Sequence, residues 1–151
     1  MHKRFSEFFI IDILVAIDKI KRIVSNLKFD DFISNEYYVD AVLRNFEIIG
    51  EASGQLLRKS DFLKEVNVEW RKIIDFRNIL IHFYFGINLK EVFRISLEEV
   101  PKLEKNILDF IKKKDDRSIF LRVIKGAKTD LAKLYRNESI KYLEKIEKII
   151  S

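Results

Sequence analysis

Long stretches of this chain contain neither glycine nor proline, and apolar residues recur in them at intervals of three and four positions. The 151 residues include only four Gly and one Pro. Glycine and proline are the residues that most often interrupt a helix, so their scarcity favours long helices over short strands and turns. We therefore predict an all-α fold.

The apolar pattern divides the chain into a helical domain, residues 1–114, and a C-terminal extension, residues 115–151. Five helices are predicted in the domain, at about residues 6–26, 35–57, 68–83, 88–99 and 101–114. The last boundary rests on Pro101, which suits the first turn of a helix. In the extension, residues 119–124 fit either a strand or a helix, and one basic amphipathic helix is predicted from about residue 129.

The composition excludes several kinds of site. Hydrophobic residues make up 48% of the chain and charged residues 35%, which is typical of a folded globular protein. There is no Cys, so disulfides, thiolate metal ligands and cysteine nucleophiles are excluded, and two histidines cannot form a multi-histidine zinc site within one chain. Neither a signal peptide nor a membrane span is recognisable, so we expect a cytoplasmic protein with no membrane partner.

Positive charge is concentrated in the C-terminal extension. Residues 111–151 carry 12 Lys and Arg against 6 Asp and Glu, whereas residues 1–110 carry 17 against 18. A basic segment of this kind suits RNA or another polyanion, and it also fits a helix whose lysines are simply solvated. The apolar face of Leu131, Leu134, Tyr142 and Ile146 leaves open a structural role in packing or dimerisation.

Arg77 lies within an apolar helical stripe. The stripe recurs at three- and four-residue intervals and consists of Trp70, Ile73, Ile74, Leu80, Ile81 and Tyr84. A guanidinium stays charged at any ordinary pH, so burying it without a partner is costly. Either a carboxylate partner holds Arg77 in place, or the residue lines a cleft that receives an anion.

A charged row on the preceding helix offers such a partner. Its members share one face of the helix predicted at residues 35–57, and they are Asp40, Arg44, Glu47 and Glu51. The row can be a solvated surface with weak ion pairs, or it can supply a carboxylate to Arg77. Glu47 and Glu51 are the candidates for that carboxylate.

His82, five residues after Arg77, is the other candidate functional residue. A single histidine near an apolar stripe is often structural, with its ring nitrogens bonded. Five residues turn a helix by about 140°, so Arg77 and His82 reach one ligand only if the helix ends near His82 or two protomers share the site. Arginine and histidine together suit metal-independent RNA cleavage. Arginine stabilises the phosphate, histidine transfers a proton, and the 2′-hydroxyl is the nucleophile.

The run from Arg77 to Tyr84 resembles the signature of HEPN-domain ribonucleases, in particular of the HEPN toxins paired with MNT nucleotidyltransferase antitoxins. In that signature, arginine is followed after four residues by histidine and, one residue further on, by tyrosine. Other segments resemble the same subfamily in order and spacing, at residues 12–17, 40–52, 70–74 and 84–88, and the resemblance spans about residues 8–112. Phe83 departs from the small residue that is frequent at its position.

The resemblance implies an antiparallel helical bundle that forms a homodimer, with RNA as the substrate and no cofactor. Arg77 and His82 would be catalytic, with Asn78 an accessory polar residue unless it only faces solvent. The cognate nucleotidyltransferase antitoxin would transfer AMP to Tyr84 and silence the toxin, unless Tyr84 serves only in core packing. The alternative is a non-catalytic HEPN partner that serves a minimal nucleotidyltransferase as a dimerisation or nucleotide-binding module.

Overall fold

The computed structural model describes residues 5–59, 62–82 and 86–151, and every regular element among them is helical. The elements are α1 (Ser6–Val24), α2 (Phe29–Ile33), α3 (Glu36–Lys59), the 3-10 turn η1 (Phe62–Glu65), α4 (Trp70–His82), α5 (Leu89–Lys112), α6 (Ser118–Lys133) and α7 (Asn137–Ile150). The prediction of an all-α fold is confirmed. The short helix α2 lies in the segment that the sequence pattern assigned to a simple connection.

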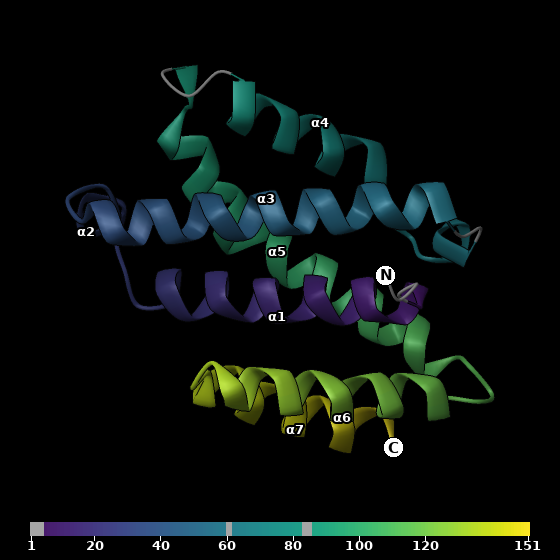
Figure 1. The fold of residues 1–151 in the computed structure, drawn as a ribbon. Coiled ribbons are helices and arrows are strands. Elements are labelled where there is room, and N and C mark those ends of the chain that lie inside the picture. Colours follow the sequence, from purple (N-terminus) through teal and green to yellow (C-terminus); the bar gives the residue numbers. More distant parts are fainter. Residues whose placement is uncertain (1–4, 60–61, 83–85) are drawn as a thin grey trace.

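The helices stack in layers around α1 (Figure 1). On one side of α1 lies α3, with α4 beyond it, and on the other side lies the hairpin of α6 and α7. The long helix α5 crosses behind α3 and α1. Because α1 is covered on both sides, its predicted apolar face is fully buried, as Ile10, Ile13, Ile17 and Ile20 show. None of the described helices is long and apolar enough to span a membrane.

The prediction of two helices separated at Pro101 is wrong, because α5 continues through that residue. An interior proline removes one backbone hydrogen bond and crowds the preceding turn, at a cost of about 3 kcal/mol. The same face of α5 is buried before and after the proline, by Phe93 and Val100 on one side and Ile107 and Ile111 on the other. Burial of each such side chain contributes about 1.5–3 kcal/mol, so packing outweighs the local cost.

The C-terminal segment is a helical hairpin, so the single amphipathic helix predicted from residue 129 is wrong. The chain leaves α6 after Lys133, turns through Tyr135, and enters α7 at Asn137. Tyr135 has a left-handed backbone, with φ of 57°. The segment 119–124, which fitted a strand or a helix, belongs to α6.

The hairpin shares the hydrophobic core of the first five helices. Its buried apolar residues, which belong to one cluster with those of α1, are Phe120, Val123, Ile124, Leu143, Ile146 and Ile150. Leu134, by contrast, is exposed in the turn, although the sequence pattern placed it on the apolar face. The division of the chain at residue 114 stays a prediction, but the part after it is bound to α1 by its own apolar face.

Candidate functional site

Helix α4, which carries the arginine and the histidine, lies at the edge of the bundle against α3 (Figure 1). Trp70 and Leu80 are buried, and the ring of Phe76 meets that of Phe46 on α3 edge to face at 5.2 Å. Ile81, which was predicted to lie in the buried stripe, is 41% exposed, and Ile79 is 46% exposed. A helix at the edge of a bundle is only partly covered by its neighbours, so both residues reach solvent.

Gly50 allows α4 to pass unusually close to α3 at Arg77. A methyl group built on Gly50 would lie 2.2 Å from Cβ of Arg77 and 2.5 Å from its Cγ. Both distances are shorter than carbon atoms tolerate, so no other residue fits without moving one helix. The glycine therefore fixes the depth at which the arginine enters the bundle. Its role was not recognised in the sequence, although a glycine inside a predicted helix is a signal of close packing.

Two of the three nitrogens of the Arg77 guanidinium have a hydrogen-bond partner among the described residues, and the third has none. Its Nη2 donates to Oε2 of Glu51 on α3 at 3.0 Å, and its Nη1 donates to Oδ1 of Asn78 at 3.2 Å. Its Nε is buried and has no hydrogen-bond partner among the described residues. The side chain as a whole is 30% exposed. The predicted carboxylate partner is thus present, and one donor of the same group remains unsatisfied.

The rest of the charged row on α3 does not reach Arg77. Glu47 pairs instead with Arg44, at 3.4 Å, and both belong to the exposed side of the helix. Asp40 is exposed near the start of α3. The charged row therefore includes both a carboxylate partner for Arg77 and an ion pair at the surface. Glu51 serves Arg77, whereas Glu47 and Arg44 form a solvated ion pair of the kind that contributes little to stability.

His82 is exposed and is the last residue of α4. A buried structural histidine is therefore not what the structure contains. Among the described residues α4 runs as far as His82, and the approach of Arg77 and His82 to one ligand stays a prediction. Phe83 and Tyr84 lie outside the described residues, and so does the predicted modification site.

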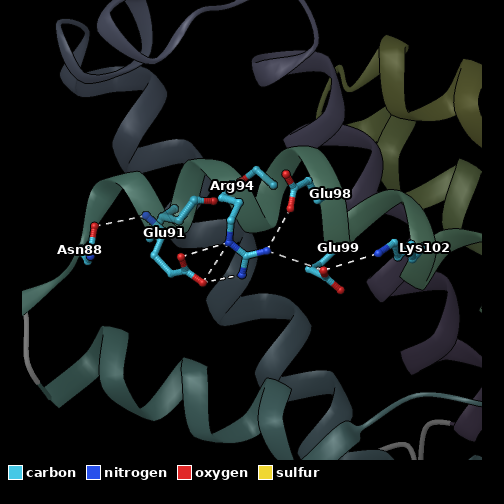
Figure 2. A network of polar contacts seen from close by, with 8 residues as sticks. Asn88, Glu91, Arg94, Glu98, Glu99 and Lys102 are labelled. Carbon is cyan, nitrogen blue, oxygen red and sulfur yellow. Dashed lines mark hydrogen bonds and ion pairs between the residues drawn. The ribbon is translucent and has the colours of Figure 1, made fainter.

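A cleft of about 540 Å³ separates α4 from α5, and one of its walls is a network of charges. Figure 2 shows Arg94 at the centre of this network on α5, between Glu91, Glu98 and Glu99, with Lys102 beyond. The hydrogen bonds to Glu91 and Glu98 hold the pKa of Arg94 above its ordinary value. The lining also includes apolar side chains, Phe46, Ile73, Phe76 and Ile95, and, at the start of α4, the ion pair of Lys72 with Glu69. Within the described ranges, no group of three or more His, Asp or Glu side chains is placed to hold a metal ion.

The chain matches the family of HepT-like ribonucleases over residues 13–110. This range ends in the last turns of α5, so α6 and α7 lie beyond the matched part. Among similar proteins, one from Methanocaldococcus jannaschii named "Putative RNase MJ1380" is 38% identical over 108 residues, which cover 71% of this chain and 97% of that protein.

Two further relatives come from other organisms. A protein of Caldanaerobacter subterraneus named "Putative RNase TTE0752" is 37% identical over 90 residues, which cover 60% of this chain and 80% of the relative. A protein of Thermococcus cleftensis named "Probable ribonuclease HepT" is 33% identical over 103 residues, 68% of this chain and 92% of the relative. No solved structure gives a significant match.

Proposed function

Because this chain belongs to the family of HepT-like ribonucleases, we propose that it cleaves RNA at a site built from Arg77 and His82, without a metal ion. The observation that carries the proposal is the state of Arg77. Its guanidinium is fixed by Glu51 and Asn78, while its buried Nε lacks a partner in the described part of the chain. The side chain of Arg77 is 30% exposed, so a guanidinium fixed in this way can bind an oxygen of a phosphate.

The proposed reaction is an internal transesterification of the RNA backbone. The 2′-oxygen attacks phosphorus while the bond to the 5′-oxygen breaks, which leaves a 2′,3′-cyclic phosphate and a free 5′-hydroxyl. Arg77 stabilises the additional negative charge that develops on the phosphoryl oxygens. Histidine can take the proton of the 2′-hydroxyl, and a second imidazole can protonate the departing 5′-oxygen. His82 is exposed at the end of α4, where a substrate can reach it.

We expect the purified protein to cleave single-stranded RNA in the presence of EDTA. The products should end in a 2′,3′-cyclic phosphate or in the 3′-phosphate that forms from it by hydrolysis. A matched oligonucleotide with one 2′-deoxy sugar should resist cleavage at that sugar only, because its nucleophile is missing there. Separation of end-labelled products on a sequencing gel measures both effects. A strict requirement for Mg²⁺, or cleavage at the deoxy position, would contradict the mechanism.

The proposed function includes a homodimer whose interface lies beside the Arg77 site. Ile79 and Ile81 on α4 and Leu97 on α5 are large apolar side chains exposed to solvent. Large apolar side chains that stay exposed are candidates for a protein interface. A symmetric interface over these helices would bring two copies of α4 together, and with them two arginines and two histidines. This supplies the second imidazole that the reaction needs.

We expect light scattering at micromolar concentration to report twice the chain mass of 18.1 kDa. Ile79→Asp should weaken the dimer at least about tenfold, because each copy then exposes a charge in place of an apolar contact. Ile149→Asp is the matched control, since Ile149 is similarly exposed but lies on α7. A fully active monomer, or equal effects of the two substitutions, would refute the shared site.

The proposed biological role is that of a toxin whose antitoxin is an MNT-type nucleotidyltransferase. The proposed modification is attack of the Tyr84 hydroxyl on the α-phosphorus of ATP, which releases pyrophosphate and leaves AMP bound to the tyrosine. Tyr84 follows His82 by two residues in the chain, so the added phosphodiester charge and adenosine would lie near the catalytic groups. A modified site of this kind would exclude the RNA phosphate.

Co-expression with the cognate nucleotidyltransferase should therefore yield a protein that carries one AMP on Tyr84 and no longer cleaves RNA. Tyr84→Phe should escape the modification and stay active in the presence of the nucleotidyltransferase. Tyr37→Phe is the control, because it removes the hydroxyl of an exposed tyrosine elsewhere in the chain. Peptide mass spectrometry locates the adduct. If co-expressed protein is silent but unmodified at Tyr84, this form of control is wrong, and a non-catalytic binding partnership gains support.

A further inference from the structure

A second hollow of about 910 Å³ lies away from α4, between α1, the first half of α3 and the turn of the C-terminal hairpin. We call it the hairpin cleft. Its lining comes from all three parts and includes Lys19, Arg22, Tyr38, Arg44, Asn45, Tyr135, Arg136 and Glu138. In Figure 1 the hairpin turn and the His82 end of α4 lie toward the same end of the bundle, on opposite sides of α3. The cleft is therefore distinct from the Arg77 site.

Positive charge in the hairpin cleft exceeds what the described residues neutralise. Arg22 pairs with Asp18 at 2.8 Å and Arg44 with Glu47 at 3.4 Å. No ion pair joins Lys19 to a carboxylate in the described part of the chain, and the same is true of Arg136 there. Burial lowers the pKa of Lys19, and the neighbouring charges of Arg136 and Arg22 lower it further. Cations crowded in this way are stabilised by an anion that binds between them.

The start of α7 adds to this imbalance. Arg136 is the residue that precedes the helix, and no side chain caps the N–H groups of the first turn. A helix N-terminus carries a partial positive charge and favours an anion, so an arginine here is opposite in sign to what helix stability prefers. The first residues of α7, Asn137, Glu138 and Ser139, line the cleft. The first turn of α7 and two cations without an ion pair among the described residues thus line the same cleft, beside the carboxylate of Glu138.

Tyr135 lines the cleft and has a backbone conformation that is unfavourable for a tyrosine. Its backbone is left-handed, with φ of 57°, a position after a helix where glycine or asparagine is the usual residue. Its side chain is 87% exposed, so packing does not explain why a large aromatic residue stands there. Tyr38 lies on the α3 side of the same hollow and is also exposed. Aromatic rings beside cations are the usual means by which proteins hold unpaired bases along a phosphate backbone.

We propose that the hairpin cleft is an accessory binding site for single-stranded RNA, in which Lys19, Arg136 and the start of α7 hold phosphates and Tyr135 stacks on a base. This inference rests on the proposed function, since it takes RNA as the substrate. The cleft needs the hairpin, which lies beyond the part of the chain that matches the family, so the site extends the recognition of RNA beyond the catalytic groups. A substrate held there would be anchored at a distance from the bond that is cleaved.

Point substitutions test the cleft better than truncation, because removal of the hairpin would expose the apolar face of α1. The double variant Lys19→Gln with Arg136→Gln is compared with Lys145→Gln and Lys148→Gln, two exposed lysines of α7 outside the cleft. Both pairs remove the same charge. Binding of a fluorescent single-stranded oligoribonucleotide is measured by anisotropy from 0.05 to 0.5 M salt, roughly the range in which such contacts are resolved. All proteins carry His82→Ala so that the RNA stays intact.

Loss of two phosphate contacts should flatten the slope of log affinity against log salt by about 1.4. If the double variant and the protein with the intact cleft bind RNA equally near 1 M salt, the double variant binds about 25-fold more weakly at 0.1 M salt. The control pair should change the slope much less. Equal effects of the two pairs would mean diffuse attraction by a basic surface and would overturn the inference, as would absence of RNA binding.

The variant Tyr135→Gly distinguishes an effect on RNA binding from an effect on stability. It should weaken RNA binding about fivefold or more through the loss of stacking. The same change should leave the melting temperature unchanged or raise it, because glycine adopts the left-handed backbone readily. Tyr37→Ala, at an exposed tyrosine outside the cleft, should bind RNA normally.

The outcomes for the accessory site and for catalysis are independent. If the cleft variants alter RNA binding as expected but the wild-type protein never cleaves RNA, the accessory site stands and the proposed catalysis falls. If the wild-type protein cleaves RNA and the cleft variants bind it normally, this inference alone is overturned.

Discussion

His82→Ala is expected to lower the rate of RNA cleavage by about 10²- to 10⁴-fold, the usual contribution of a positioned acid or base. Because His82 is exposed at the end of α4, its removal should leave the helices intact, which far-ultraviolet circular dichroism checks. Arg77→Lys should cost about 10²-fold or more, because lysine keeps the charge but lacks the planar fork that holds Glu51 and a phosphate at once.

The matched control for the arginine is Arg71→Lys. Arg71 lies on the same helix but is exposed and away from Glu51, so the substitution should leave cleavage within about twofold of the wild type, as surface changes usually do. Single-turnover rates with saturating RNA separate the chemical step from binding. Full activity of the His82 variant would remove histidine from the mechanism, and equal losses in the two arginine variants would remove the special role of Arg77.

Gly50→Ala is expected to destabilise the fold by about 1–3 kcal/mol, the usual cost of forcing an extra carbon into a packed site. The added methyl group would lie 2.2 Å from Cβ of Arg77, so α4 has to move away from α3. Movement of α4 would also shift the guanidinium relative to Glu51, and we expect cleavage to fall with stability. Denaturant titration measures the free energy of unfolding, and the cleavage assay measures the accompanying loss of ribonuclease activity.

Gly126→Ala is the control for this substitution. Gly126 lies on α6 with no atom within 4 Å of a built methyl group, so alanine should stabilise the helix by about 0.5–1 kcal/mol. The same substitution, glycine to alanine, should thus lower the free energy of unfolding at position 50 and raise it at position 126. If Gly50→Ala is neutral or stabilising, the close approach of α3 and α4 is not as the structure has it.

Much of the fold follows from local rules that the sequence displays. The period of the apolar residues located α1, α3 and α4 within a few residues of their ends, because a buried helical face must repeat every 3.6 positions. The same rules failed at Pro101, where the proline indicated a boundary that packing on both sides of it overrides. They also failed at Tyr135, where no glycine marks the turn that divides the C-terminal segment into two helices.

For the candidate site, the sequence by itself supplied the residue types and their order: a charged row on one helix, an arginine and a histidine on the next, and a tyrosine two residues after the histidine. The sequence could not decide which carboxylate contacts Arg77, because that depends on the relative position of two packed helices along their axes. The tertiary structure decided in favour of Glu51, at 3.0 Å, through the contact that Gly50 permits. The hairpin cleft was equally beyond the sequence, since its cations come from α1 and from a turn more than a hundred residues later. Only the packing of the hairpin on α1 places their charges together.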